Sequence, residues 1–127
     1  MTKEDRKTLL KSQQGELDAV LMYNALADAC SDPLDRATFK QLAQEEGRHA
    51  SIFHQLTGKT LKPKKDKAVL IPLLYHVIGK KKLYPMIAQG EYDAVKNYEP
   101  VAEKFPEIES VRKDEQRHGD TVKALLN

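Results

Sequence analysis

Glu46-Gly47-Arg48-His49 is the stretch that decides the fold, because its chemistry returns later in the chain as Glu115-Gln116-Arg117-His118. Residues three apart on a helix share one face, so the carboxylate and the imidazole of each stretch can reach the same ion. One Glu-x-x-His pair is a common accident in a chain rich in Glu. Two pairs in matching surroundings are much harder to explain by chance, and they predict two helices that each bring a Glu and a His to a metal.

Both stretches lie at the centre of an apolar helical seam, in which apolar residues recur in steps of three and four. The flanking apolar residues are Phe39, Leu42, Phe53 and Leu56 around the first copy, and Ile108, Val111, Val122 and Leu125 around the second. Two further seams, over 9–30 and 87–105, each carry one central carboxylate, Glu16 and Glu91. A carboxylate in a buried seam is costly unless it has a partner. The pattern therefore predicts four helices with polar centres.

Capping residues and prolines mark where these helices begin and end. Thr2-Lys3-Glu4-Asp5 has the form of a capping box for the first helix, and Asp32-Pro33 is typical of the start of the second. The other expected markers are Gly58 after the second helix, Pro85 in the first turn of the third, a kink or irregular turn at Pro100, and Pro106 at the start of the fourth.

Residues 59–82 form a long connection between the second and third helices. The segment 59–67 is basic, whereas 68–78 is apolar and is expected to form a short helix. A connection of this length can carry the chain to the other end of a bundle, so that the third helix runs parallel to the second. The lysines at 59–67 and 80–82 are expected to form a solvated edge, and docking of an acidic partner is the alternative.

The two halves of the chain resemble each other, and the likeness extends from the motifs to both helical hairpins. Two hairpins related by a pseudo-twofold axis would bring four carboxylates and two histidines to one level. The predicted metal ligands are Glu16, Glu46, His49, Glu91, Glu115 and His118. Four carboxylates carry −4, which two divalent ions cancel. Oxygen-rich ligation with one imidazole per metal favours iron or manganese, and zinc is a possible substitute.

Tyr23 and Tyr98 occupy matching places in the two halves, two turns after Glu16 and Glu91 on the same helix faces. Each hydroxyl is a candidate to hydrogen-bond a ligand carboxylate. The alternative, plain packing in the core, is equally compatible with the pattern. No residue beyond the metal ligands is assigned a catalytic role.

Composition places these motifs in one soluble domain over residues 1–127. A net charge of +2 among 127 residues gives no general footprint for nucleic acid. The single cysteine, Cys30, has no partner for a disulfide, which suits a reducing cytoplasm. No stretch approaches the roughly 18 apolar residues of a spanning helix, so we expect a cytoplasmic protein without membrane insertion.

With these motifs the chain resembles the ferritin-like superfamily and, within it, the rubrerythrin family. The resemblance implies a four-helix bundle with a long crossover connection that contains a short helix. It also implies two carboxylate-bridged iron ions, with Glu46 and Glu115 as bridges and Glu16 and Glu91 as terminal ligands. The implied activity is reduction of hydrogen peroxide, or oxidation of Fe(II) by dioxygen, in defence against oxidative stress. A homodimer is the implied assembly.

Two departures from the family pattern bear on the reaction. Rubrerythrins typically carry an additional carboxylate three residues after the third-helix ligand, and Ala94 stands there in this chain. The four iron-binding cysteines of the family's rubredoxin domain are absent too, so an electron donor would be a separate, rubredoxin-like protein. A non-catalytic module that binds, senses or delivers iron is the alternative to an enzyme, and a bundle with a purely structural polar layer is the third hypothesis.

Overall fold

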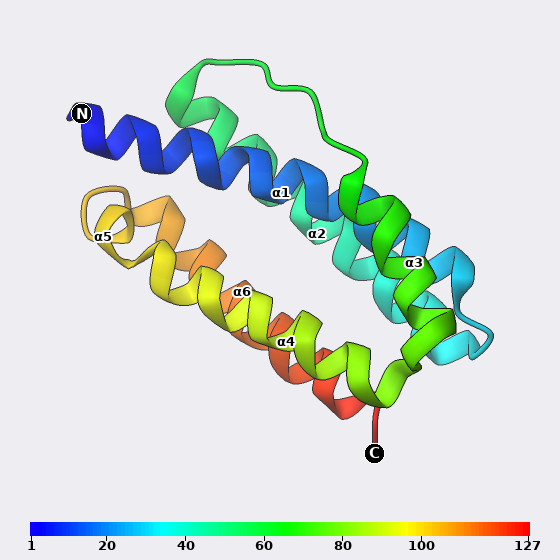
Figure 1. Ribbon diagram of the computed structural model, residues 1–127. Helices are drawn as coiled ribbons and strands as arrows, with labels where there is room; N and C mark the ends of the chain where they lie inside the picture. Colours follow the sequence, from blue (N-terminus) through cyan, green and yellow to red (C-terminus); the bar gives the residue numbers. More distant parts are fainter. The chain divides into compact units, whose positions relative to one another are not determined.

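The computed structural model describes all 127 residues, which form helices and connections without any strand (Figure 1). The helices are α1 (Lys3–Ala29), α2 (Pro33–Thr57), α3 (Asp66–Ile78), α4 (Lys80–Asn97), α5 (Glu99–Ala102) and α6 (Pro106–Ala124). The chain divides into two compact units, Met1–Val77 and Ile78–Asn127. The expectation of an all-α protein is confirmed, whereas a single domain over 1–127 stays a prediction. No helix combines the length and the apolar character that crossing a membrane requires.

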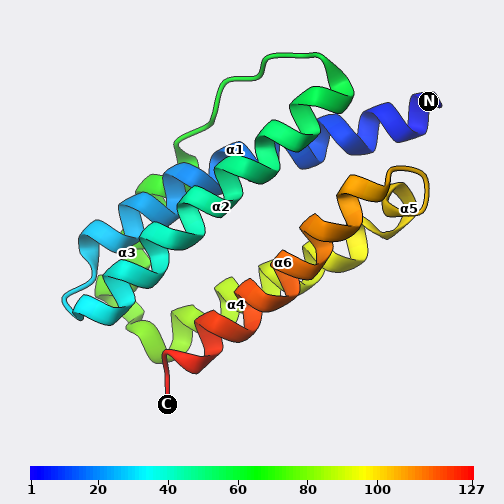
Figure 2. The same cartoon turned by 180° about the vertical axis from the view of Figure 1, so that it is seen from behind.

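In the first unit α1 and α2 form a hairpin, lying side by side in both views (Figures 1 and 2). The predicted caps define its helix ends. Thr2 and Asp5 form the capping box, and Asp32 accepts hydrogen bonds from two backbone N–H groups at the start of α2. Gly58 ends α2 with φ 68°, in the left-handed region that a residue without Cβ adopts at little cost.

The core of the first unit comes from the predicted seams. Its fully buried side chains include Leu9, Tyr23, Leu26, Phe39, Leu42 and Phe53. The rings of Tyr23 and Phe39 stack across the hairpin with centroids 5.8 Å apart. This packing fixes the register in which the polar seam residues of α1 face those of α2.

Side chains of α1 hold the backbone of the loop that follows α2. Gln13 and Gln14 donate to the carbonyls of Lys59 (2.7 Å) and Lys62 (2.8 Å), and Asp18 accepts from the N–H of Lys64 (2.7 Å). The short helix expected over 68–78 is confirmed as α3, and none of its residues is buried. The loop is therefore fixed through its backbone, which leaves its lysine side chains exposed.

In the second unit α4 and α6 lie side by side, and the short α5 stands between them in the chain (Figures 1 and 2). The irregular turn expected at Pro100 is confirmed, because α4 ends at Asn97 and Pro100 lies in the first turn of α5. Pro106 begins α6 as predicted. The placement of Pro85 in the first turn of its helix is wrong, since α4 begins at Lys80 and Pro85 lies inside it.

Candidate metal centre

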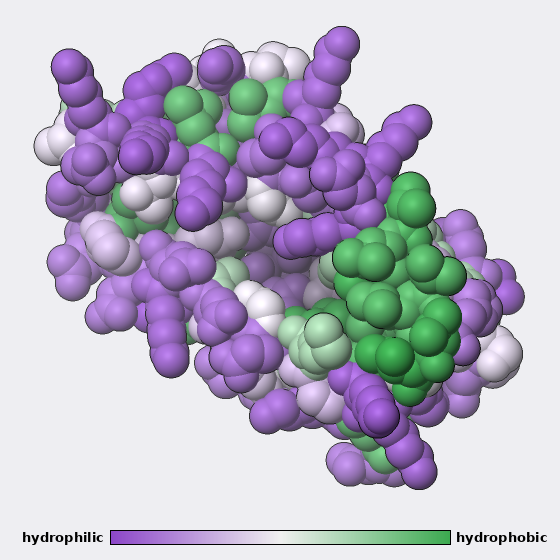
Figure 3. Space-filling model, in the orientation of Figure 1, coloured by the Kyte–Doolittle hydropathy of each residue, from purple (hydrophilic) through white to green (hydrophobic).

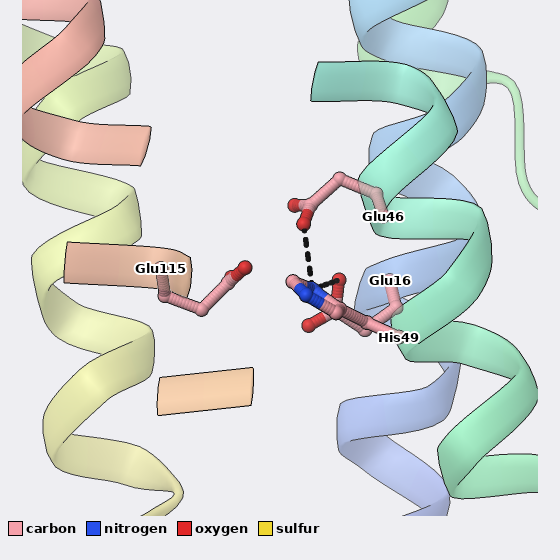
Figure 4. Close-up of side chains that lie close together, drawn as sticks. All are labelled: Glu16, Glu46, His49 and Glu115. Carbon is pink, nitrogen blue, oxygen red and sulfur yellow. Dashed lines mark hydrogen bonds and ion pairs between the residues drawn. The ribbon is translucent and has the colours of Figure 1, made fainter. Parts of the chain in front are cut away.

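The first unit brings Glu16 of α1 to the Glu46–His49 pair of α2, and these three residues are called the first cluster. Nδ1 of His49 lies 3.0 Å from Oε1 of Glu46 and 3.7 Å from Oε2 of Glu16 (Figure 4). All three side chains are at most 2% exposed. One possible ligand atom from each lies within 4.8 Å of those of the other two, close enough for one ion to contact all three.

The second unit builds the same arrangement from Glu91 of α4 and the Glu115–His118 pair of α6, the second cluster. Nδ1 of His118 lies 3.4 Å from Oε1 of Glu115 and 3.7 Å from Oε2 of Glu91. These side chains are at most 6% exposed, and their ligand atoms again lie within 4.8 Å of one another. In both clusters the same ring nitrogen faces one carboxylate from its own helix and one from the neighbouring helix.

Burial has a direct electrostatic consequence for Glu91. The pKa of its carboxyl is raised from 4.5 to about 7, chiefly by desolvation; the hydrogen bond and charge of His118 oppose the rise, and the negative charge of Glu115 adds to it. The protonated form is favoured because a buried carboxylate without a cation is costly. A divalent ion would replace that proton by a positive charge.

The donor chemistry of both clusters fits a divalent transition metal. Each offers two carboxylates and one imidazole, a set that suits iron or manganese. The one thiol of the chain, at Cys30, lies outside both clusters. If the polar layer were purely structural, each cluster would bury two carboxylates beside a single imidazole. One imidazole cannot offset two negative charges.

The two tyrosines singled out by the sequence are both buried. Tyr23 is 1% exposed and stacks on Phe39, and Tyr98 is 6% exposed at the C-terminal end of α4. Their packing is thus established, while a hydrogen bond from either hydroxyl to a ligand carboxylate stays a prediction.

A contact beside the second cluster was not anticipated from the sequence. A Cβ built on Gly119, the residue after His118, would lie 2.4 Å from Cε1 of Tyr92, the residue after Glu91. The Tyr92 ring therefore lies against the backbone of α6, and its hydroxyl donates to Asp120 at 2.6 Å, which raises its pKa to about 12. The first half has Leu17 and Ala50 at the matching places. In the second half the larger Tyr92 thus faces the smaller Gly119, where the first half has Leu17 and Ala50. A comparison of the two halves of the sequence could have revealed this contact.

We expect Gly119→Ala to lower the free energy of unfolding by about 1–3 kcal/mol, because the added methyl group cannot fit beside the Tyr92 ring. Urea unfolding followed by circular dichroism measures this. Gly90→Ala is the matched control: its Cβ would meet no atom within 4 Å, so it should stabilise the helix by about 0.5–1 kcal/mol.

Adding Tyr92→Leu to Gly119→Ala rebuilds the Leu and Ala pair found in the first half and should recover much of the lost stability. Gly119→Ala alone with wild-type stability would show that the ring moves aside at no cost. In that case the tight contact would not constrain the packing of α4 against α6.

Buried Glu residues and Glu-x-x-His pairs on packed helices define the class of dinuclear carboxylate proteins of the ferritin-like type. The chain belongs to the rubrerythrin family, whose sequence model matches residues 7–126. It is 30% identical to reverse rubrerythrin-1 of Clostridium acetobutylicum, over an alignment of 131 residues that covers 98% of this chain and 67% of that protein. No solved structure matches the chain significantly.

Membership confirms the family resemblance and the ferritin-like helical fold expected from the sequence. It also identifies the chain as an iron-binding protein of a di-iron family, which agrees with the buried carboxylate and histidine clusters.

Proposed function

We propose that the two clusters together form one di-iron site with six protein ligands. The ligands are Glu16, Glu46, His49, Glu91, Glu115 and His118. Three observations support this: the family of the chain, the internal repeat of its sequence, and the matching geometry of the cluster in each unit. By family likeness Glu46 and Glu115 would be the carboxylates shared between the ions, and Glu16 and Glu91 would each hold one ion.

The function that this site supports best is that of an oxidoreductase, a peroxidase or ferroxidase that acts in oxidative stress. When bound, two Fe(II) ions can supply two electrons to hydrogen peroxide or dioxygen. The protein's contribution is to present four carboxylates and two imidazoles from buried positions, which offset the charge of the ions and exclude bulk water. The observation that carries the proposal is the repeated cluster, in which one ring nitrogen faces two carboxylates from two helices.

The remaining parts of the proposal follow from sequence and family. By family likeness, electrons would come from a rubredoxin-like protein, since residues 1–127 contain one cysteine, Cys30, and a rubredoxin iron needs four. A cytoplasmic homodimer is the expected form. Manganese or zinc can substitute for iron in a site of this donor set.

A module that binds, senses or delivers iron without turnover is the second candidate. Ala94 favours it, because by family likeness a further carboxylate belongs there and serves when an iron shifts position during the redox cycle. The two candidates share the metal site and differ only in whether the bound iron reacts.

The candidates are separated by preparing the Fe(II)-loaded protein anaerobically and then mixing it with hydrogen peroxide or with dioxygen. An oxidoreductase is expected to become ferric with at least one of the two oxidants, as measured by near-ultraviolet absorbance and by consumption of the oxidant. Repeated cycles with a chemical reductant test turnover. Bound Fe(II) that neither oxidant changes would exclude the enzyme and leave the iron-binding module.

A further inference from the structure

The outward face of α3 is apolar, unlike that of an ordinary surface helix. Its exposed side chains recur in helical steps and form a stripe of Val69, Leu70, Leu73 and Val77, which are 69%, 50%, 57% and 70% exposed. Figure 3 shows this stripe as a continuous hydrophobic patch over α3, bordered by hydrophilic side chains. A surface helix normally turns its charged residues outward, so an exposed apolar stripe of this kind marks a site of interaction.

The charge around α3 is as unusual as its apolar face. Residues 59–82 contain eight lysines and one acidic residue, Asp66, a formal charge of +7. The other 13 basic and 18 acidic residues carry −5, which gives the +2 of the whole chain. Five of the lysines precede Ala68 and three directly follow Gly79, so both ends of the apolar stretch are basic.

We propose that α3 docks this protein on an anionic lipid surface, where the helix lies in the plane of the membrane. The apolar stripe would enter the boundary between headgroups and acyl chains, and the lysines at both ends would contact lipid phosphates. With 13 residues, α3 is shorter than the roughly 20 that a spanning helix needs, which agrees with a helix that lies on the membrane.

The lysines favour a lipid surface over an acidic protein as the occupant. Residues 59–82 contain no arginine, although protein–protein interfaces are enriched in Arg and depleted in Lys. Lysine is a flexible, strongly hydrated charge that suits a fluid layer of phosphates. The stripe is also the exposed face of a single helix, and a lipid surface can accept it without shape complementarity.

Co-sedimentation of the full iron-loaded chain with vesicles tests the proposal. One set contains phosphatidylcholine and phosphatidylglycerol in equal parts, and the other contains phosphatidylcholine alone. We expect binding to the anionic vesicles, little binding to the neutral ones, and release at high salt. Leu73→Glu should weaken binding roughly tenfold or more, because a buried Leu side chain contributes about that factor.

Matched variants elsewhere on the protein test whether binding depends on α3 and its flanking lysines. Leu34→Glu makes the same change at a side chain that is 66% exposed on α2 and should bind like the wild type. Lys64→Gln with Lys65→Gln should weaken binding, whereas Lys7→Gln with Lys11→Gln on α1 should weaken it less. Circular dichroism confirms folding, and Val77→Glu replaces Leu73→Glu should that variant lose helicity.

Three results would overturn the proposal. The first is a wild type that stays in solution with anionic vesicles, and the second is unchanged binding by Leu73→Glu. The third is a dimer that Leu73→Glu dissociates while vesicles bind neither form, because the stripe would then be covered by a second copy of the chain. Iron content is measured in the same samples, so loss of the di-iron site is distinguished from loss of lipid binding.

Discussion

His118→Ala is expected to retain at most about one iron ion per chain, against about two in the wild type purified from cells grown with iron. His118 is fully buried, and its Nδ1 lies within 3.7 Å of carboxylate oxygens from α4 and α6. Removing the ring takes away the one nitrogen donor of the second cluster and leaves two buried carboxylates to hold the ion. Glu46→Ala should also lose iron, because it removes one of the two carboxylates of the first cluster. Elemental analysis of the purified proteins measures both.

His54→Ala is the matched control for this experiment. His54 lies on α2 five residues after His49, is exposed and belongs to neither cluster, so the variant should keep the iron of the wild type. Wild-type iron content in His118→Ala or Glu46→Ala would show that the ligands are misassigned. Wild-type protein without any bound metal would exclude both metal hypotheses in favour of a structural polar layer.

The metal-free protein should become less stable as the pH rises from 4.5 to above 7, through the titration of Glu91. The folded protein holds the pKa of this carboxyl at about 7, above the ordinary value of 4.5. A raised pKa in the folded state contributes stability that is complete below 4.5 and is lost as the pH rises through 7. The shift corresponds to a loss on the order of 3 kcal/mol in the free energy of unfolding.

Urea unfolding of the metal-free protein across this pH range is compared with that of Glu91→Gln. The amide stays neutral at every pH, so the variant should lack this part of the decline and be the more stable protein above pH 7. Glu103→Gln, an exposed residue of the same unit, should follow the wild type. Parallel curves for Glu91→Gln and the wild type would show that the carboxyl is solvated in the folded protein.

The helix ends were predictable because their determinants are local. The Thr2 and Asp32 caps and the Gly58 C-cap depend on one residue and its immediate neighbours, and all three are confirmed. Pro85 shows the limit of this reasoning. A proline is most favourable in the first turn, but α4 extends further toward its N-terminus, to Gly79 with φ 81°.

The residues of each cluster were predictable for another reason, namely that Glu and His recur at seam positions that an unpaired charge would not tolerate. The Tyr92–Gly119 contact depends on how α4 and α6 pack against each other, and neither helix sequence alone indicates this packing. The outward face of α3 could not be assigned either. Residues 68–78 are apolar all round, and only a helix with a polar side reveals from its sequence which side faces the core.

The hydrogen-bonded loop also bears on the conformational entropy that the first unit loses on folding. Gln13 and Gln14 donate hydrogen bonds to the backbone of the loop after α2, Asp18 accepts one from it, and α3 follows as a helix about 20 Å long. Fixing the backbone of each loop residue costs about 1–2 kcal/mol of conformational entropy, and these hydrogen bonds offset part of that cost. Polar residues of α1 that are not among the predicted ligands would thus stabilise the loop that carries the exposed lysines.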